Sequence, residues 1–124
     1  MTFDCNGVWK SFLRPDPHNP PTTDPNPNDG LIDIDPEDEN GNFGGTHRKS
    51  GQRLFDGKCT RNTITFKRRD GRTTYTYSGT ISFEVIDGRR TAVVRRGVCR
   101  STTTDRHEKD GVTTDDPWDG VKTT

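Results

Sequence analysis

The chain has 124 residues, of which 24% are hydrophobic and 31% charged, with nineteen Lys and Arg against nineteen Asp and Glu. This length allows one small domain, spanning residues 1–124. One Ala and three Leu stand against nineteen Thr, so the residues that propagate helices are nearly absent and a helical bundle is excluded. No run of 18 apolar residues exists, so we expect no membrane partner.

The first predicted strand is Gly7 to Leu13. It is followed by residues 14–30, which contain six of the eight prolines. Proline lacks the N–H that a β-ladder needs, so this segment predicts a long surface loop after the first strand.

Three short strands are expected next. Leu31 to Ile34 and Asn42 to Arg48 predict a hairpin around the Asn-Gly pair at 40–41, and Gln52 to Cys59 predicts another strand.

Residues 62–100 carry the clearest pattern. Thr73 to Ile86 alternates strictly between two faces, and a strand of this length must bend to stay within a small domain, with Gly79 as the natural place. Asp-Gly pairs at 70–71 and 87–88 supply the turns on either side. We therefore predict a three-stranded antiparallel meander.

Residues 101–124 form a polar tail that either adds a last strand around Trp118 or frays. The fold class is all-β, and seven or eight antiparallel strands in sequential hairpins predict a small up-and-down β-barrel, with a small sandwich as the alternative. The barrel is favoured because closure removes exposed sheet edges.

Strand alternation predicts a mostly aromatic barrel interior. Its predicted members are Trp9, Ser11, Phe43, His47, Ile64, Phe66, Tyr75, Tyr77, Phe83 and Trp118. Apolar walls with a few hydroxyl or imidazole groups are typical of a small-molecule pocket. The same residues would also fill the centre of a narrow eight-stranded barrel, so pocket and core both stay open.

With the strands placed, several motifs resemble those of the avidin and streptavidin family. They are Gly7-Val8-Trp9 after Cys5, Asn40-Gly41-Asn42-Phe43-Gly44-Gly45-Thr46, Tyr77-Ser78-Gly79 and Asp115-Asp116-Pro117-Trp118. The resemblance implies a ligand-binding barrel that assembles as a homo-oligomer, with Trp118 packing on a neighbouring subunit.

The resemblance, together with the alternation, predicts a set of ligand-binding residues. They are Trp9, Ser11, His47, Phe66, Tyr75, Tyr77 and Trp118. His47 stands where the family has Tyr, and Phe66 and, approximately, Val94 replace two of its pocket tryptophans. A biotin site of this pattern lacks two stacking walls, so the resemblance predicts a small-ligand binder without tight biotin binding.

The sequence contains no recognisable catalytic or cofactor motif: G-x-S-x-G, H-E-x-x-H, C-x-x-C and a Gly-rich phosphate loop are all missing. We therefore expect a non-enzymatic protein without a cofactor. Asp24 to Gly30, with Asp33 and Asp35, superficially resembles a calcium loop, but its spacing is one residue too long. We expect an acidic, solvated loop and no metal site.

Charge is balanced only in total, because residues 14–45 carry a net charge of -7 and residues 61–100 one of +7. Two interpretations follow. Either the acidic and basic segments compensate one another, or the basic strands bind an anionic partner such as nucleic acid or an acidic protein. The second interpretation uses Arg68, Arg69, Arg72, Arg89, Arg90, Arg95 and Arg96.

Three cysteines, Cys5, Cys59 and Cys99, permit one disulfide and leave one thiol, and the sequence leaves the pairing open. A bridge in so small a core favours an oxidising, secreted or periplasmic compartment over the cytoplasm. Residues 1–5 show no signal-peptide pattern, so we expect a chain that is intracellular or already trimmed.

Overall fold

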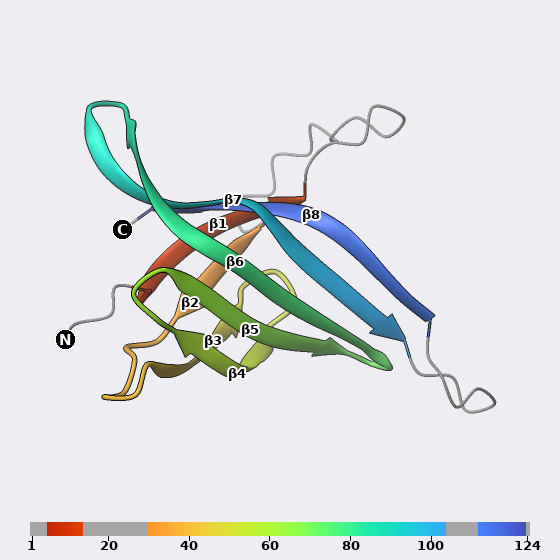
Figure 1. Ribbon diagram of the computed structural model, residues 1–124. Helices are drawn as coiled ribbons and strands as arrows, with labels where there is room; N and C mark the ends of the chain where they lie inside the picture. Colours follow the sequence, from red (N-terminus) through yellow and green to blue (C-terminus); the bar gives the residue numbers. More distant parts are fainter. Residues whose placement is uncertain (1–4, 14–29, 104–111, 124) are drawn as a thin grey trace.

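The computed structural model describes residues 5–13, 30–103 and 112–123 (Figure 1). Its strands are β1 Gly7–Leu13, β2 Leu31–Ile34, β3 Asn42–His47, β4 Gln52–Cys59, β5 Thr63–Asp70, β6 Thr73–Ile86, β7 Arg89–Thr103 and β8 Val112–Lys122. The predicted Pro-rich loop, the calcium-like sequence up to Asp29 and most of the link between β7 and β8 lie outside the described residues.

The eight strands form a closed barrel in which each strand pairs antiparallel with the next in sequence. β8 closes the barrel against β1, from Leu13 opposite Trp118 to Trp9 opposite Lys122. The up-and-down barrel is thus confirmed, and the sandwich alternative is wrong. The part of the chain that the structure describes holds no helix long and apolar enough to cross a membrane.

β6 and β7 both bend where the sheet must curve. The pairing of β6 with β7 shifts between Ser78 and Ile81, on either side of Gly79 as predicted. A second shift lies between Val94 and Gly97, where β7 meets β8. These bulges increase the local twist, and so let long strands wrap around a small barrel.

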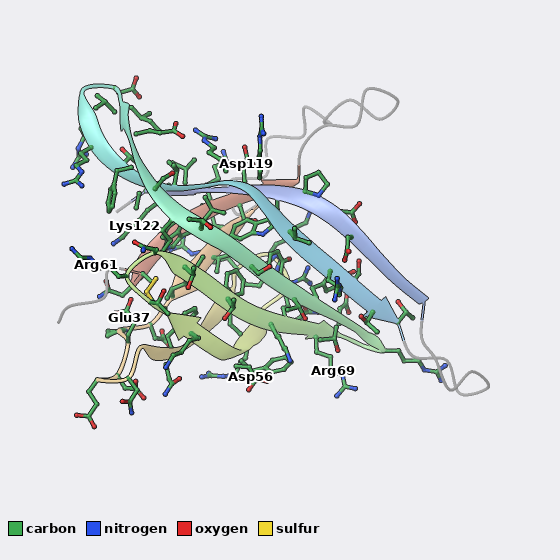
Figure 2. The ribbon with its side chains drawn as sticks, in the orientation of Figure 1. Glu37, Asp56, Arg61, Arg69, Asp119 and Lys122 are labelled. Atoms are coloured by element: carbon green, nitrogen blue, oxygen red, sulfur yellow. A yellow bond between two sulfur atoms is a disulfide. The ribbon has the colours of Figure 1, made fainter. Side chains whose placement is uncertain are left out.

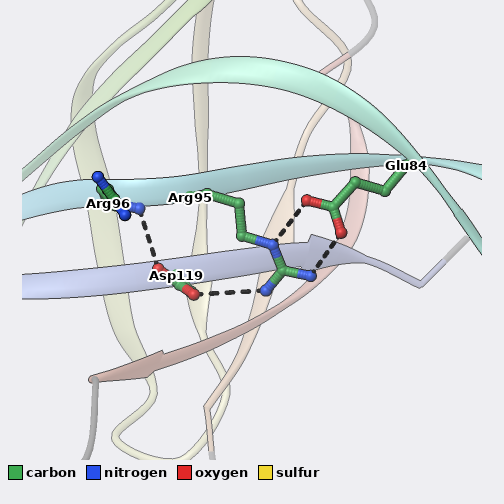
Figure 3. A network of polar contacts seen from close by, with 4 residues as sticks. All are labelled: Glu84, Arg95, Arg96 and Asp119. Atoms are coloured by element: carbon green, nitrogen blue, oxygen red, sulfur yellow. Dashed lines mark hydrogen bonds and ion pairs between the residues drawn. The ribbon is translucent and has the colours of Figure 1, made fainter.

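The bulge in β7 is held by a buried carboxylate. Arg96 has a φ of 57°, a conformation that costs a non-glycine residue free energy. Asp119, 7% exposed, accepts hydrogen bonds from the Arg96 backbone N–H at 3.0 Å and from Arg95 Nη1 at 3.3 Å (Figure 3). The Arg95 guanidinium also reaches both oxygens of Glu84 at 2.8 Å. One polar network therefore ties β6, β7 and β8 together.

Aromatic rings fill the centre of the barrel. Phe66 stacks on Tyr77 with ring centroids 4.7 Å apart, and Trp118 packs edge-on against both rings. The space between Trp9, Phe66, Trp118 and their aliphatic neighbours has no room for a water molecule. The centre is therefore a packed core, which was one of the two alternatives that the aromatic interior left open.

β6 and β7 continue beyond the barrel as a two-stranded ribbon, which we call the arm, residues 82–92 (Figure 1). β5 pairs with β6 only as far as Thr80, and β8 pairs with β7 only from Val93 onward. The prediction that Phe83 lines the interior is wrong: its side chain is 48% exposed because it lies on the arm.

A disulfide joins Cys5, just before β1, to Cys59 at the end of β4, with Cα atoms 6.2 Å apart (Figure 2). Closing a loop of 54 residues restricts the unfolded chain by about 4 kcal/mol in the chain-entropy picture. Cys99 is the free thiol, 4% exposed. Burial raises the pKa of the Cys99 thiol, so this group stays protonated and unreactive at neutral pH.

Thiol titration tests this assignment. We expect no alkylation of the native protein, one thiol per chain after unfolding, and three after unfolding with a reductant. Mass spectrometry of digested, alkylated protein should locate the first label on Cys99. A label on Cys5 or Cys59 without reductant would contradict the pairing.

Replacement of Asp119 tests the bulge network. Asp119→Ala leaves the Arg96 N–H without its acceptor and should lower the free energy of unfolding by about 2 kcal/mol. Arg96→Gly removes backbone strain while keeping that hydrogen bond, so it should leave stability unchanged or raise it by about 1 kcal/mol. Urea unfolding of both variants measures the difference, and equal destabilisation would contradict the proposed cause.

Candidate ligand-binding site

The structure places the predicted site residues in two layers. Trp9, Phe66, Tyr77 and Trp118 are each no more than 7% exposed and form a closed floor. Ser11, His47 and Tyr75 are half-buried and lie on the same inner side, closer to the end of the barrel. Trp118 is 2% exposed within its own barrel. Its packing on a neighbouring subunit stays a prediction.

The strand register sets the direction of the upper layer. Directly opposed residues of antiparallel strands face the same side of a sheet. Buried Ile32 lies opposite His47, and His47 lies opposite Gln52. Buried Leu54 lies opposite Arg68, and Arg68 lies opposite Tyr75. All of these side chains therefore face inward at one end of the barrel, which we call the Arg68 end.

Arg68 is held at the centre of this layer by three neighbours. Its Nη1 donates to Gln52 Oε1 at 2.8 Å, and its Nη2 donates to the Tyr77 hydroxyl at 3.1 Å. The guanidinium carbon lies 4.2 Å from the centre of the Tyr75 ring, which is a cation-π contact. The side chain is thus oriented from three strands, β4, β5 and β6.

None of these neighbours neutralises Arg68. Among the described residues, no carboxylate lies within ion-pair distance of its guanidinium, although five other Arg or Lys to Asp or Glu contacts are present. Its Nε is buried and makes no hydrogen bond. A half-buried cation with an unpaired donor is costly, and such a group calls for an explanation.

The groups beneath Arg68 are neutral. Burial raises the pKa of the Tyr77 hydroxyl, while the hydrogen bond from Arg68 acts in the opposite direction. Burial likewise keeps the neighbouring thiol of Cys99 protonated. The positive charge of Arg68 therefore borders an uncharged aromatic floor.

Sequence reasoning missed Arg68 and Gln52 as members of this site. Strand alternation could have identified Arg68, because Arg68 continues the every-second-residue pattern of the buried residues Ile64 and Phe66. The prediction of an exposed basic strand face placed Arg68 outside instead. Gln52 gave a weaker signal, as a polar residue two positions before buried Leu54.

The predicted cationic strand face is only partly present. Arg68 points inward, so the prediction that it lies on an exposed face is wrong. Arg95 is bound by Glu84 and Asp119, which offset its charge. Arg100 also pairs with Asp115 across β7 and β8. The acidic partners in these pairs are Glu84, Asp115 and Asp119, so none of the pairs joins residues 14–45 to residues 61–100, and the mutual compensation of those two segments stays a prediction.

One residue of the acidic segment pairs with an arginine close to it in the chain. Asp33, part of the calcium-like sequence, accepts two hydrogen bonds from Arg48 at 2.7 and 2.8 Å. The ligand atoms of Cys5, Glu37 and Cys59 lie within 4.8 Å of one another. However, both sulfurs are in the disulfide and Glu37 Oε1 accepts the Cys5 N–H, so this cluster fastens the start of β1 rather than offering thiolates to a metal.

His47 has a local hydrogen-bonding role. Its Nδ1 lies 2.7 Å from the Ser50 hydroxyl, in the tight connection between β3 and β4. This contact fixes the imidazole at the rim of the Arg68 end, where it adds one polar group to the layer.

Family models, curated proteins and solved structures were compared with the chain, and none of them matches it.

Replacing Arg68 by an apolar residue tests whether its charge stabilises the barrel. Arg68→Met keeps the length of the side chain and removes a half-buried, unneutralised charge, so we expect the free energy of unfolding to stay the same or rise by about 1 kcal/mol. Urea unfolding measures it, with Arg69→Met on the outer face as the control. A loss above about 2 kcal/mol would assign Arg68 a structural role instead.

Proposed function

We propose that the protein is a non-enzymatic β-barrel that binds a small carboxylate-bearing molecule at the Arg68 end. One observation carries this proposal: Arg68 faces inward at the barrel end with a buried, unpaired Nε and no acidic partner among the described residues. A ligand carboxylate would supply the missing negative charge.

The chemistry of the guanidinium favours a carboxylate. Its planar N–H fork matches the two oxygens of a carboxylate and binds them with charge-assisted hydrogen bonds. Gln52 and Tyr77 already accept from its two terminal nitrogens, which fixes the fork before a ligand arrives. A preorganised cation loses little conformational entropy on binding.

The surroundings favour a ligand with a flat apolar part. Tyr75 lies beside the guanidinium, and Trp9 and Trp118 close the layer below. Ser11 and His47 offer polar groups at the rim, and both are half-buried, within reach of solvent. Apolar walls with few orienting polar groups are the usual composition of small-molecule sites.

The packed centre restricts the ligand to this outer layer. Because the rings leave no room for a water molecule between Trp9, Phe66 and Trp118, the ligand would rest on the aromatic floor rather than enter it. The resemblance to the avidin family supports the same end of the barrel, since Trp9 and Ser11 match ligand-contacting positions there. The changes at His47 and Phe66 argue against tight biotin binding.

Calorimetry on the intact protein tests the proposal. The probes are benzoate, indole-3-acetate and biotin, each compared with its uncharged carboxamide. We expect at least one carboxylate to bind and its amide to bind at least tenfold more weakly. Arg68→Gln should lower the affinity for the carboxylate by 10- to 100-fold, because hydrogen bonds to charged groups contribute about 1.5–3 kcal/mol.

Arg69→Gln is the matched control, because it removes the same charge one residue away on the exposed face. It should change affinity less than twofold. Trp9→Ala reports on the aromatic floor. If every probe fails to bind, or if Arg69→Gln weakens binding as much as Arg68→Gln, the proposed site is wrong.

A further inference from the structure

On the arm, no described strand pairs with the outer edge of β6 (Figure 1). β5 pairs with β6 only as far as Thr80, and the Ile81 N–H still donates to the Asn62 carbonyl on that side, at 2.7 Å. Successive residues of a strand direct their backbone groups to alternate sides. Phe83 and Val85 therefore direct their N–H and C=O groups to the side on which β5 has ended.

The hairpin turn of the arm gives the same assignment. The turn at 87–88 is closed by Ile86, which lies opposite Arg89. In a two-residue hairpin the closing pair is hydrogen-bonded, so Ile86 directs its backbone groups to β7. Alternation gives Glu84 the same direction as Ile86, and it points the backbone groups of Val85 and Phe83 away from β7. We call this outward row of backbone groups, at Phe83 and Val85, the free edge.

The side chains on the free edge are apolar and exposed. Phe83 is 48% exposed and Val85 76%, the two highest values among the large hydrophobic residues that the structure describes. They are two positions apart, so both lie on one face of β6. On β7, Ala92 lies opposite Phe83. Arg90 lies opposite Val85, and its guanidinium carbon is 4.2 Å from the centre of the Phe83 ring. The free edge thus combines unpaired backbone groups with an apolar face.

The arm lacks the main features that keep an edge strand from pairing. Such features are a proline, a bulge, or a charge on the face that an added strand would cover. Residues 81–86 contain no proline, and their pairing with β7 runs without a shift. Their single charge, Glu84, lies on the other face from Phe83, and both of its oxygens bind Arg95. A further strand can therefore be added at the free edge.

The free edge is complementary to itself. In an antiparallel pair of two copies centred on Glu84, Phe83 of each copy lies opposite Val85 of the other. Both residues direct their backbone groups across the edge, so each such pair would exchange both of its hydrogen bonds. Centring the pair on Phe83 would place Val85 opposite Ile81, whose N–H already donates within the barrel. Centring it on Val85 would place Phe83 opposite Asp87, which lies in the turn with a φ of 51°. Only the register centred on Glu84 uses both free residues of both copies.

Charge and size fit a weak dimer of this kind. Glu84 of the two copies would lie opposite each other, and like charges in that position repel. Each carboxylate is already neutralised by Arg95 of its own copy, with both oxygens at 2.8 Å. The free edge is short compared with stable interfaces, which bury about 1,200–2,000 Å². We therefore expect a reversible association that depends on protein concentration.

We propose that the free edge of the arm pairs antiparallel with the free edge of a second copy of this chain, in the register centred on Glu84. The dimer is then held by one sheet with two strands from each arm. Tyr75, near the start of β6, faces the Arg68 end, whereas Phe83 lies near the finish of the same strand. The interface leaves the proposed carboxylate site open and does not depend on it.

Analytical ultracentrifugation of the full chain tests the proposal. We expect the mass to rise from monomer towards dimer between roughly 1 μM and 1 mM. Val85→Pro removes an outward N–H without touching the pairing with β7, so it should raise the dissociation constant of the dimer at least tenfold. Arg90→Pro is the matched control, because the N–H of Arg90 points to the opposite edge of the arm. It should change the constant less than threefold.

A cysteine at the centre of the pairing tests the register. Directly opposed residues of a non-hydrogen-bonded pair have Cα atoms about 4.5 Å apart, which lies within the range of a disulfide. With oxidised glutathione as the oxidant, Glu84→Cys should therefore form a covalent dimer on a non-reducing gel. Ser82→Cys should stay monomeric, because its partner in this register is Ile86.

A second variant keeps the backbone donor. Val85→Lys places a charge opposite Phe83 of the second copy and should weaken the dimer as much as Val85→Pro. A constant monomer mass up to about 1 mM, an equal loss in Val85→Pro and Arg90→Pro, or preferential crosslinking of Ser82→Cys would overturn the proposal. An unrelated extended peptide that binds this edge of a chain that stays monomeric would overturn it too. Far-UV circular dichroism and urea unfolding of each variant verify that the barrel is intact.

Discussion

The packing of Trp118 against Phe66 and Tyr77 is the constraint on which the rest of the structure depends. A chain that is 24% hydrophobic cannot build a core from many aliphatic side chains, so a few large rings fill the centre. Glycine makes this possible at Gly97 on β7 and at Gly120 on Trp118's own strand, β8, since a Cβ at Gly97 would lie 2.6 Å from Trp118 Nε1 and one at Gly120 2.7 Å from its ring. A centre filled in this way leaves no room for a ligand between Trp9, Phe66 and Trp118.

Strand positions could be predicted because alternation and Asp-Gly turns act locally. The turn at Asp87 and Gly88 has positive φ at both residues, as that pair predicts, and β6 has the predicted bounds. The reach of β6 and β7 beyond the barrel could not be predicted in this way, because it depends on where β5 and β8 stop pairing. Phe83 was therefore assigned to the interior although its alternation was read correctly.

The candidate site was half predictable for a related reason. Trp9, Ser11, His47 and Tyr75 follow from parity, and they do lie on the inner side. Arg68 falls on the same face by strand alternation. However, a charged residue in a basic segment is usually exposed, and for that reason Arg68 was expected on the outer face. The disulfide pairing and the contacts of Asp119 join residues far apart in the sequence, so only the closed barrel reveals them.

Arg68 and Arg95 show how the same residue type acquires opposite roles in one small barrel. Arg95 is bound on both sides by carboxylates, and its bonds hold a strained bulge in place. Among the described residues, Arg68 contacts a neutral amide, a phenol and an aromatic face, and none of these groups is an anion. Burial of a cation carries a desolvation cost that a paired anion and well-formed hydrogen bonds offset. This contrast between Arg95 and Arg68 is the physical basis of our proposal that Arg68 binds a ligand.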